Sequence, residues 1–155
     1  MKKRIIHILI LFLFTFIFCC CSHVSNNSRD IEFMEIPIKG DVYSFGSKLE
    51  KKGYQFYDED KTYCQLIYHG NYLNKEATIR LDYEEESKEI KNARVIFDKD
   101  IPSASALINE YTEKYGECKM EPKYGFVYYT WVLDGGKLVI GTCDSPILSI
   151  EYHRE

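Results

Sequence analysis

The six cysteines carry the most distinctive chemistry of this sequence. Three stand together at positions 19–21, where a thiol is a candidate for covalent attachment of lipid. The others, Cys64, Cys118 and Cys143, are far apart along the chain, and outside the cytoplasm two of them could form a disulfide. Cys118 and Cys143 are the candidate pair because they fall in the same half of the chain. Cys64 is better explained as a small buried apolar residue of a strand.

The segment before the consecutive cysteines has the layout of an export signal. Basic residues 2–4 precede residues 5–18, which are apolar apart from His7 and Thr15. We expect residues 1–20 to be a signal peptide and the polar residues 21–30 to be a flexible tether. An uncleaved membrane anchor is the alternative, although the apolar run is at the lower limit of what spans a bilayer.

The end of this segment resembles a bacterial lipobox, in which an apolar residue at −3 and a small residue at −1 precede the lipid-bearing cysteine. Cys20 has Ile17 and Cys19 at those positions, and Cys21 has Phe18 and Cys20. Because Ala, Gly or Ser is usual at −1, the resemblance leaves both Cys20 and Cys21 open as the attachment site.

Other chemistry has no support in the residue spacing. His69 and His153 stand alone, and acidic residues 82–86 lack the alternating ligands and central glycine of a calcium loop. We therefore expect no catalytic residue, no metal and no cofactor. Three of the 20 basic residues lie in the expected signal peptide, which leaves an acidic domain without a basic stripe. Nucleic acid is not an expected partner.

Residues 124–133 are the segment that most favours ligand binding. Aromatic side chains alternate along it on both sides of a predicted strand, and both faces cannot be equally buried if helices cover only one. Tyrosine and tryptophan combine a large contact area with a polar group, which suits partner binding. Alternatively, a loop or the tether covers one aromatic set. The predicted ligand-binding residues are Tyr124, Phe126, Tyr128, Tyr129 and Trp131.

The elements that would position these residues follow from periodicity and from turn residues. A helix is predicted between Asp41 and Gly53, and a second one between Pro102 and Gly116. A leading strand over 32–38 and eight further strands are predicted, the eight at residues 54–57, 62–70, 76–83, 90–97, 117–120, 124–133, 137–143 and 147–153. The expected fold class of residues 31–155 is α+β, a single domain.

The order of these elements indicates an internal duplication. Each half has a helix followed by four strands, in repeats of about 31–98 and 99–155. We expect the two repeats to form one curved antiparallel sheet with both helices on one face.

Two resemblances accompany this pattern. The sequence looks like small Bacteroidetes lipoproteins of unknown function, and the duplicated topology is similar to that of beta-lactamase inhibitor protein. The second resemblance implies a concave sheet that grips a partner protein, but fold alone does not establish function. The residues that carry the first resemblance are Phe33, Ile36-Pro37-Ile38, Gly40, Phe45, Leu49, Gly53, Tyr111 and Lys114-Tyr115-Gly116.

The sequence thus predicts a lipoprotein of the bacterial cell envelope, anchored by lipid in a membrane that faces the periplasm or the cell surface. Its domain is expected to be a non-catalytic binding module for a protein or other envelope ligand, with inhibition as one version. A structural or assembly component of the envelope is the alternative, and an envelope hydrolase is a weaker one.

Overall fold

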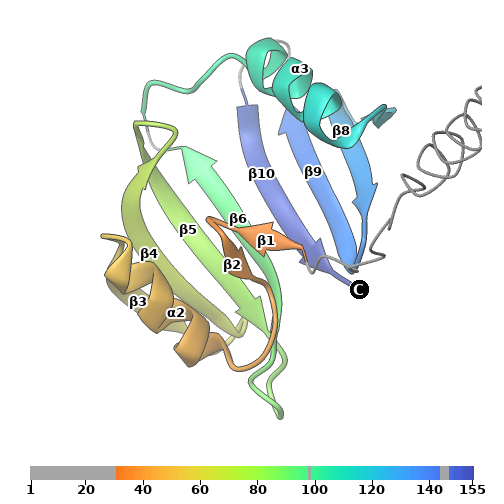
Figure 1. Cartoon of the computed structure of the whole chain (residues 1–155). Coiled ribbons are helices and arrows are strands. Elements are labelled where there is room, and N and C mark those ends of the chain that lie inside the picture. Colours follow the sequence, from red (N-terminus) through yellow and green to blue (C-terminus); the bar gives the residue numbers. More distant parts are fainter. Residues whose placement is uncertain (1–30, 98, 144–146) are drawn as a thin grey trace, which may run out of the picture.

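Regular alternation of apolar and polar residues is realised as one large antiparallel sheet in the computed structural model. The structure describes residues 31–97, 99–143 and 147–155, so the predicted signal peptide and tether, with Cys20 and Cys21, lie outside the described residues. Within them the fold is α+β, as predicted (Figure 1). The elements are β1 (Glu32–Phe33), β2 (Ile36–Pro37), α2 (Val42–Lys51), β3 (Gln55–Asp60), β4 (Gln65–Tyr72), β5 (Lys75–Tyr83), β6 (Ile90–Phe97), α3 (Ala104–Tyr115), β7 (Lys119–Lys123), β8 (Phe126–Leu133), β9 (Gly136–Thr142) and β10 (Ile147–Arg154).

The eight strands of the main sheet lie in the order β3-β4-β5-β6-β10-β9-β8-β7, with every neighbouring pair antiparallel. Strands close in sequence pair through short connections. The turn between β4 and β5, for example, uses Leu73 and Asn74 at φ angles of 51° and 60°, which suit a two-residue hairpin. The pairing of β6 with β10 is different, because it places Val95 opposite Ile150 from a distant part of the chain.

The register of the strands gives the sheet one apolar face. Residues that lie opposite one another on five adjacent strands are all buried, which leaves little of this face in water. This row consists of Tyr68, Ile79, Val95, Ile150 and Ile140. Burial of such a row is the main stabilising contribution to the fold.

Helix α2 begins and packs as the sequence predicts. The Oδ1 atom of Asp41 accepts a hydrogen bond of 2.8 Å from the backbone N–H of Ser44 and so caps the helix. Its buried face includes Gly46, where a Cβ atom would overlap the hydroxyl of Tyr68. Helix α3 buries Leu107 and Tyr111, but the Ser103 side chain at its start makes no capping hydrogen bond.

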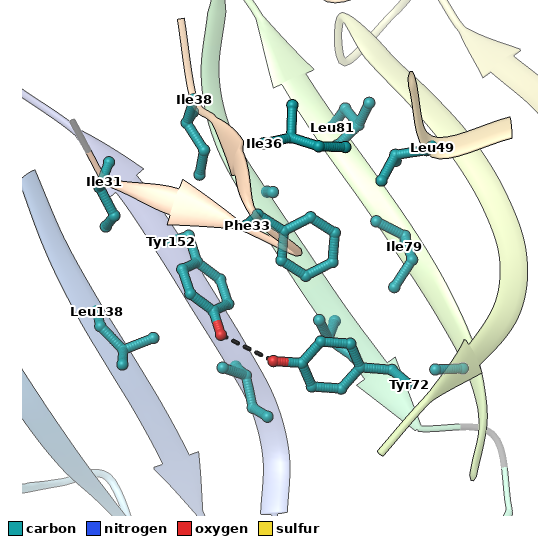
Figure 2. Close-up of a cluster of buried hydrophobic side chains, with 14 of the residues drawn as sticks. Ile31, Phe33, Ile36, Ile38, Leu49, Tyr72, Ile79, Leu81, Leu138 and Tyr152 are labelled. Carbon is teal, nitrogen blue, oxygen red and sulfur yellow. Dashed lines mark hydrogen bonds between the residues drawn. The ribbon is translucent and has the colours of Figure 1, made fainter. Parts of the chain in front are cut away.

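The predicted leading strand over 32–38 is wrong, because this segment forms the two-stranded hairpin β1–β2. Met34 and Glu35 turn the chain at φ angles of 54° and 62°. The hairpin lies between the two helices, as Figure 1 shows. Its Phe33 side chain is fully buried in the core. Its ring centroid lies 5.6 Å from that of Tyr72 and 5.2 Å from that of Tyr152 (Figure 2).

Three buried tyrosine hydroxyls meet beneath this hairpin. The Oη atom of Tyr72 lies 2.8 Å from that of Tyr152 and 3.3 Å from that of Tyr111, and Tyr111 and Tyr152 are 3.1 Å apart. Burial raises the pKa of Tyr72 and of Tyr152, so both phenols keep their protons. The hydroxyls therefore satisfy one another as donors and acceptors and join β4, α3 and β10.

Replacement of Phe33 by alanine should lower the free energy of unfolding by about 3–5 kcal/mol, because Phe33 is fully buried between two rings. The matched control is Phe56→Ala on β3, whose side chain is 50% exposed and should cost about 1 kcal/mol or less. Urea unfolding followed by tryptophan fluorescence measures both. Equal losses in the two variants would contradict the placement of the hairpin in the core.

Candidate functional site

Polar and charged side chains occupy the alternate positions of the same strands and therefore point to the opposite, polar face of the sheet. Register places Arg80 of β5 opposite Arg94 of β6, and Arg94 opposite Glu151 of β10. Two residues further along β5, on the same face, Asp82 lies opposite Asn92, and Asn92 lies opposite His153. These side chains are half-buried and form, with Ser149, a polar cluster that consists of Arg80, Asp82, Asn92, Arg94, Ser149, Glu151 and His153.

Glu151 is the centre of the hydrogen bonds in this cluster. Its Oε1 atom accepts a bond of 3.0 Å from the Ser149 hydroxyl, and its Oε2 atom lies 3.0 Å from Nε2 of His153. The Nε atom of Arg94 is 3.3 Å from Oε1. Burial raises the pKa of Glu151, but the bond from His153 and the charge on Arg94 outweigh it, so the pKa is lowered. Glu151 is therefore ionised at neutral pH.

The cluster also has bonding capacity that it does not use. Among the described residues, Arg80 makes no ion pair and no side-chain hydrogen bond. The N–H at Nε of Arg94 does not point at Glu151, so those two groups attract as charges without forming a hydrogen bond. The Oδ1 atoms of Asp82 and Asn92 lack partners as well. Two arginines directly opposite each other on neighbouring strands repel, so the sheet gains nothing from this arrangement.

Ser149, Glu151 and His153 include the residue types of a hydrolytic triad, but in an arrangement that does not fit the reaction. In such a triad the histidine bonds the nucleophile, whereas here Glu151 bonds both Ser149 and His153. The carboxylate of Glu151 therefore lies between the Ser149 hydroxyl and the His153 ring, in the place where a triad has the histidine. The arrangement suits a hydrogen-bonded binding surface better than acyl transfer.

The structure separates the predicted aromatic binding residues. Trp131 is 1% exposed, stacks edge-on with Tyr111 and donates a hydrogen bond of 3.1 Å to the carbonyl of Gly116. Tyr129 also packs against the core. Trp131 therefore cannot present a surface to a partner.

Of the remaining aromatic residues, Phe126 and Tyr128 share the polar face and are half-buried. Tyr124 is 87% exposed in the turn before β8, at a φ angle of 54°. The polar cluster was not predicted from the sequence, where its one signal is the alternation of charged residues along β5, β6 and β10.

The candidate disulfide between Cys118 and Cys143 is not formed, and both are free thiols, as is Cys64. The predicted place of Cys64 as a buried residue of a strand is wrong, because Cys64 is half-buried in the turn before β4, at a φ angle of 53°. Strand β8 lies between Cys118 and Cys143: continued by one residue, the register places Cys118 at the level of Trp131 and Cys143 at the level of Phe126. Five residues of strand correspond to roughly 17 Å, which is more than the Cα separation of a disulfide.

A hollow of about 240 Å³ lies at the other side of the fold and holds a second carboxylate. The Oε1 atom of Glu59 accepts hydrogen bonds from the hydroxyls of Tyr43, at 2.8 Å, and Tyr83, at 2.9 Å. These bonds lower the pKa of Glu59 and join α2 to β3 and β5. We interpret this group as structural.

The described part of the chain contains no group of three or more His, Cys, Asp or Glu that could hold a metal ion. None of its helices is long and apolar enough to cross a bilayer.

The variant Glu151→Gln should unfold more easily at pH 7, by about 1–3 kcal/mol, because Arg94 loses its counter-charge. The folded pKa of Glu151 lies below the ordinary value of 4.5, so its contribution is present above that pH and disappears as the pH falls through the folded pKa. The difference in the free energy of unfolding between Glu151→Gln and the parent protein should therefore become smaller at acidic pH. Urea unfolding between neutral and acidic pH measures it.

Glu86→Gln is the control, because Glu86 is exposed in the connection after β5 and should leave stability nearly unchanged. A difference for Glu151→Gln that stays constant down to acidic pH would contradict the role of the ionised carboxylate.

Comparison of the chain with protein-family models, with curated proteins and with solved structures finds no match. The resemblances to Bacteroidetes lipoproteins and to beta-lactamase inhibitor protein therefore stay predictions. What the protein binds must be inferred from the charges and hydrogen bonds of its own polar face.

Proposed function

We propose that this chain is a non-catalytic binding module of the bacterial envelope, held at a membrane by lipid on Cys20 or Cys21, and that the polar face of its sheet binds a protein partner. The observation that carries the binding role is the unused capacity of the polar cluster, in which Arg80 has no counter-ion among the described residues. A half-buried charge without a partner costs stability, and a ligand that supplies the partner recovers that cost.

The architecture that we propose for this module is the predicted pair of repeats, each a helix followed by four strands, with both helices on one face. In its support, the strand order β3-β4-β5-β6 is mirrored by β7-β8-β9-β10 about the β6–β10 pair. Helix α2 packs on Tyr68, and helix α3 packs on Trp131. By register these two side chains belong to the same face. The polar face is then free for a partner.

The proposed anchor rests on the sequence of the first 30 residues. A basic start, an apolar run and consecutive cysteines precede a polar stretch that ends one residue before the described domain. A lipid on Cys20 or Cys21 would hold the domain close to the membrane without embedding it.

Labelling of cells with a radioactive or clickable fatty acid tests the anchor. The parent protein should incorporate the label, and of Cys20→Ala and Cys21→Ala only one should lose it. Cys64→Ala, which removes a thiol within the domain, is the matched control and should stay labelled. Label that persists when both Cys20 and Cys21 are replaced would refute the anchor.

Site-specific photo-crosslinking in cells tests the binding face. A benzophenone amino acid at Thr130 or Val139, which are half-buried on the polar face, should form adducts with the same partner. The control position is Ser47, exposed on α2, which should not form that adduct. Absence of adducts from both polar-face positions, or the same adduct from Ser47, would contradict the proposal.

A further inference from the structure

Within the described part of the chain, the half-buried Arg80 of the polar face makes no ion pair. We propose that the Arg80 guanidinium binds a single carboxylate of an extended segment of the partner protein. This inference rests on the proposed function and deepens it by naming the chemistry of the contact.

The first support is the cost of the arrangement in the free protein. Arg80 is half-buried in the middle of β5, directly opposite Arg94, and it lies far enough from Asp82 and Glu151 that neither forms an ion pair with it. Glu151 is already engaged by Arg94, Ser149 and His153. The Nε atom of Arg80 is shielded from solvent, and among the described residues its charge stays unpaired. Such a group is prepared for an anion, because little side-chain freedom remains to be lost on binding.

The charge of the surroundings selects the kind of anion. Arg80 and Arg94 carry two positive charges, and Asp82 and Glu151 on the same face carry two negative ones. The four charges sum to zero, so the site has no excess of positive charge to balance a dianionic phosphate, and a singly charged anion adds less negative charge beside the two carboxylates. A carboxylate carries one charge and is planar, which matches the parallel N–H groups of a guanidinium.

The shape of the face selects an extended chain. Arg80 does not line the hollow near Glu59, the hollow of about 440 Å³ near His69 or the hollow near Arg154. Thr78, Arg80 and Asp82 follow one another on the same face at the spacing of alternate strand residues, about 7 Å. An extended segment that lies along β5 has the same spacing and can place successive side chains over these positions. Ile67, opposite Arg80 on β4, offers an apolar neighbour to the residues that flank the carboxylate.

Titration of the full chain, purified in detergent, with a short blocked peptide tests the inference. The probe has one central glutamate among threonine and valine residues, and its partner probe has glutamine instead. The glutamate peptide should bind about tenfold more tightly than the glutamine peptide, as one charge-assisted hydrogen-bonded contact provides. Arg80→Gln should remove this preference. Lys48→Gln, which removes an exposed charge on α2, should keep it.

Two further measurements separate binding from a structural role. The stability of Arg80→Gln should equal or exceed that of the parent protein, since the repulsion from Arg94 disappears, whereas a structural arginine would leave a less stable variant. Acetate should displace the glutamate peptide at lower concentration than inorganic phosphate does.

The inference is overturned if the two peptides bind equally or not at all, if Arg80→Gln keeps the preference, or if phosphate is the better competitor. Crosslinking from Thr130 and Val139 in the Arg80→Gln protein then distinguishes failure of the role of Arg80 from failure of the proposed binding function. If the Arg80→Gln protein gives the full yield of adducts and the parent protein shows no preference for the glutamate peptide, only the role of Arg80 is refuted. Absence of adducts in the parent protein removes the proposed function itself.

Discussion

The pairing of β10 with β6 is the contact on which the rest of this structure depends. The strands within β3–β6 and within β7–β10 pair with their neighbours in sequence, and the β6–β10 pair joins these two halves of the sheet. The same pair aligns Val95 with Ile150 on the apolar face. The same register aligns Arg94 with Glu151 on the polar face. Because side chains alternate along a strand, a shift of one residue would exchange the two faces and place the charges in the core. The hydrophobic row therefore fixes the geometry of the polar cluster.

Much of the fold was predictable because its signals are local. Alternating residues and turn glycines located the eight strands of the main sheet, and Asp41 located the start of α2. The β1–β2 hairpin was missed because Met34 and Glu35 adopt left-handed conformations that are normal for glycine or asparagine. At those positions the burial of Phe33 outweighs the local preference of the backbone.

The candidate site was much less predictable, because it consists of contacts between distant strands. The aromatic pattern of β8 correctly indicates two populated faces, but it does not tell which one is buried, and Trp131 belongs to the buried one. The opposition of Arg80 and Arg94 depends on the register of β5 with β6, and that of Arg94 and Glu151 on the long-range pair. No local spacing contains this information. Charged residues at alternate positions otherwise look like an ordinary solvated strand face.

The three tyrosine hydroxyls beneath the hairpin have a consequence for how the domain comes apart. Tyr72, Tyr111 and Tyr152 belong to segments that are up to 80 residues apart in the chain. If either half of the sheet opened alone, at least one buried hydroxyl would lose its partners and the others would remain in an apolar interior. Partial opening is therefore disfavoured relative to complete unfolding. The three hydroxyls thus favour unfolding of the two halves of the sheet together.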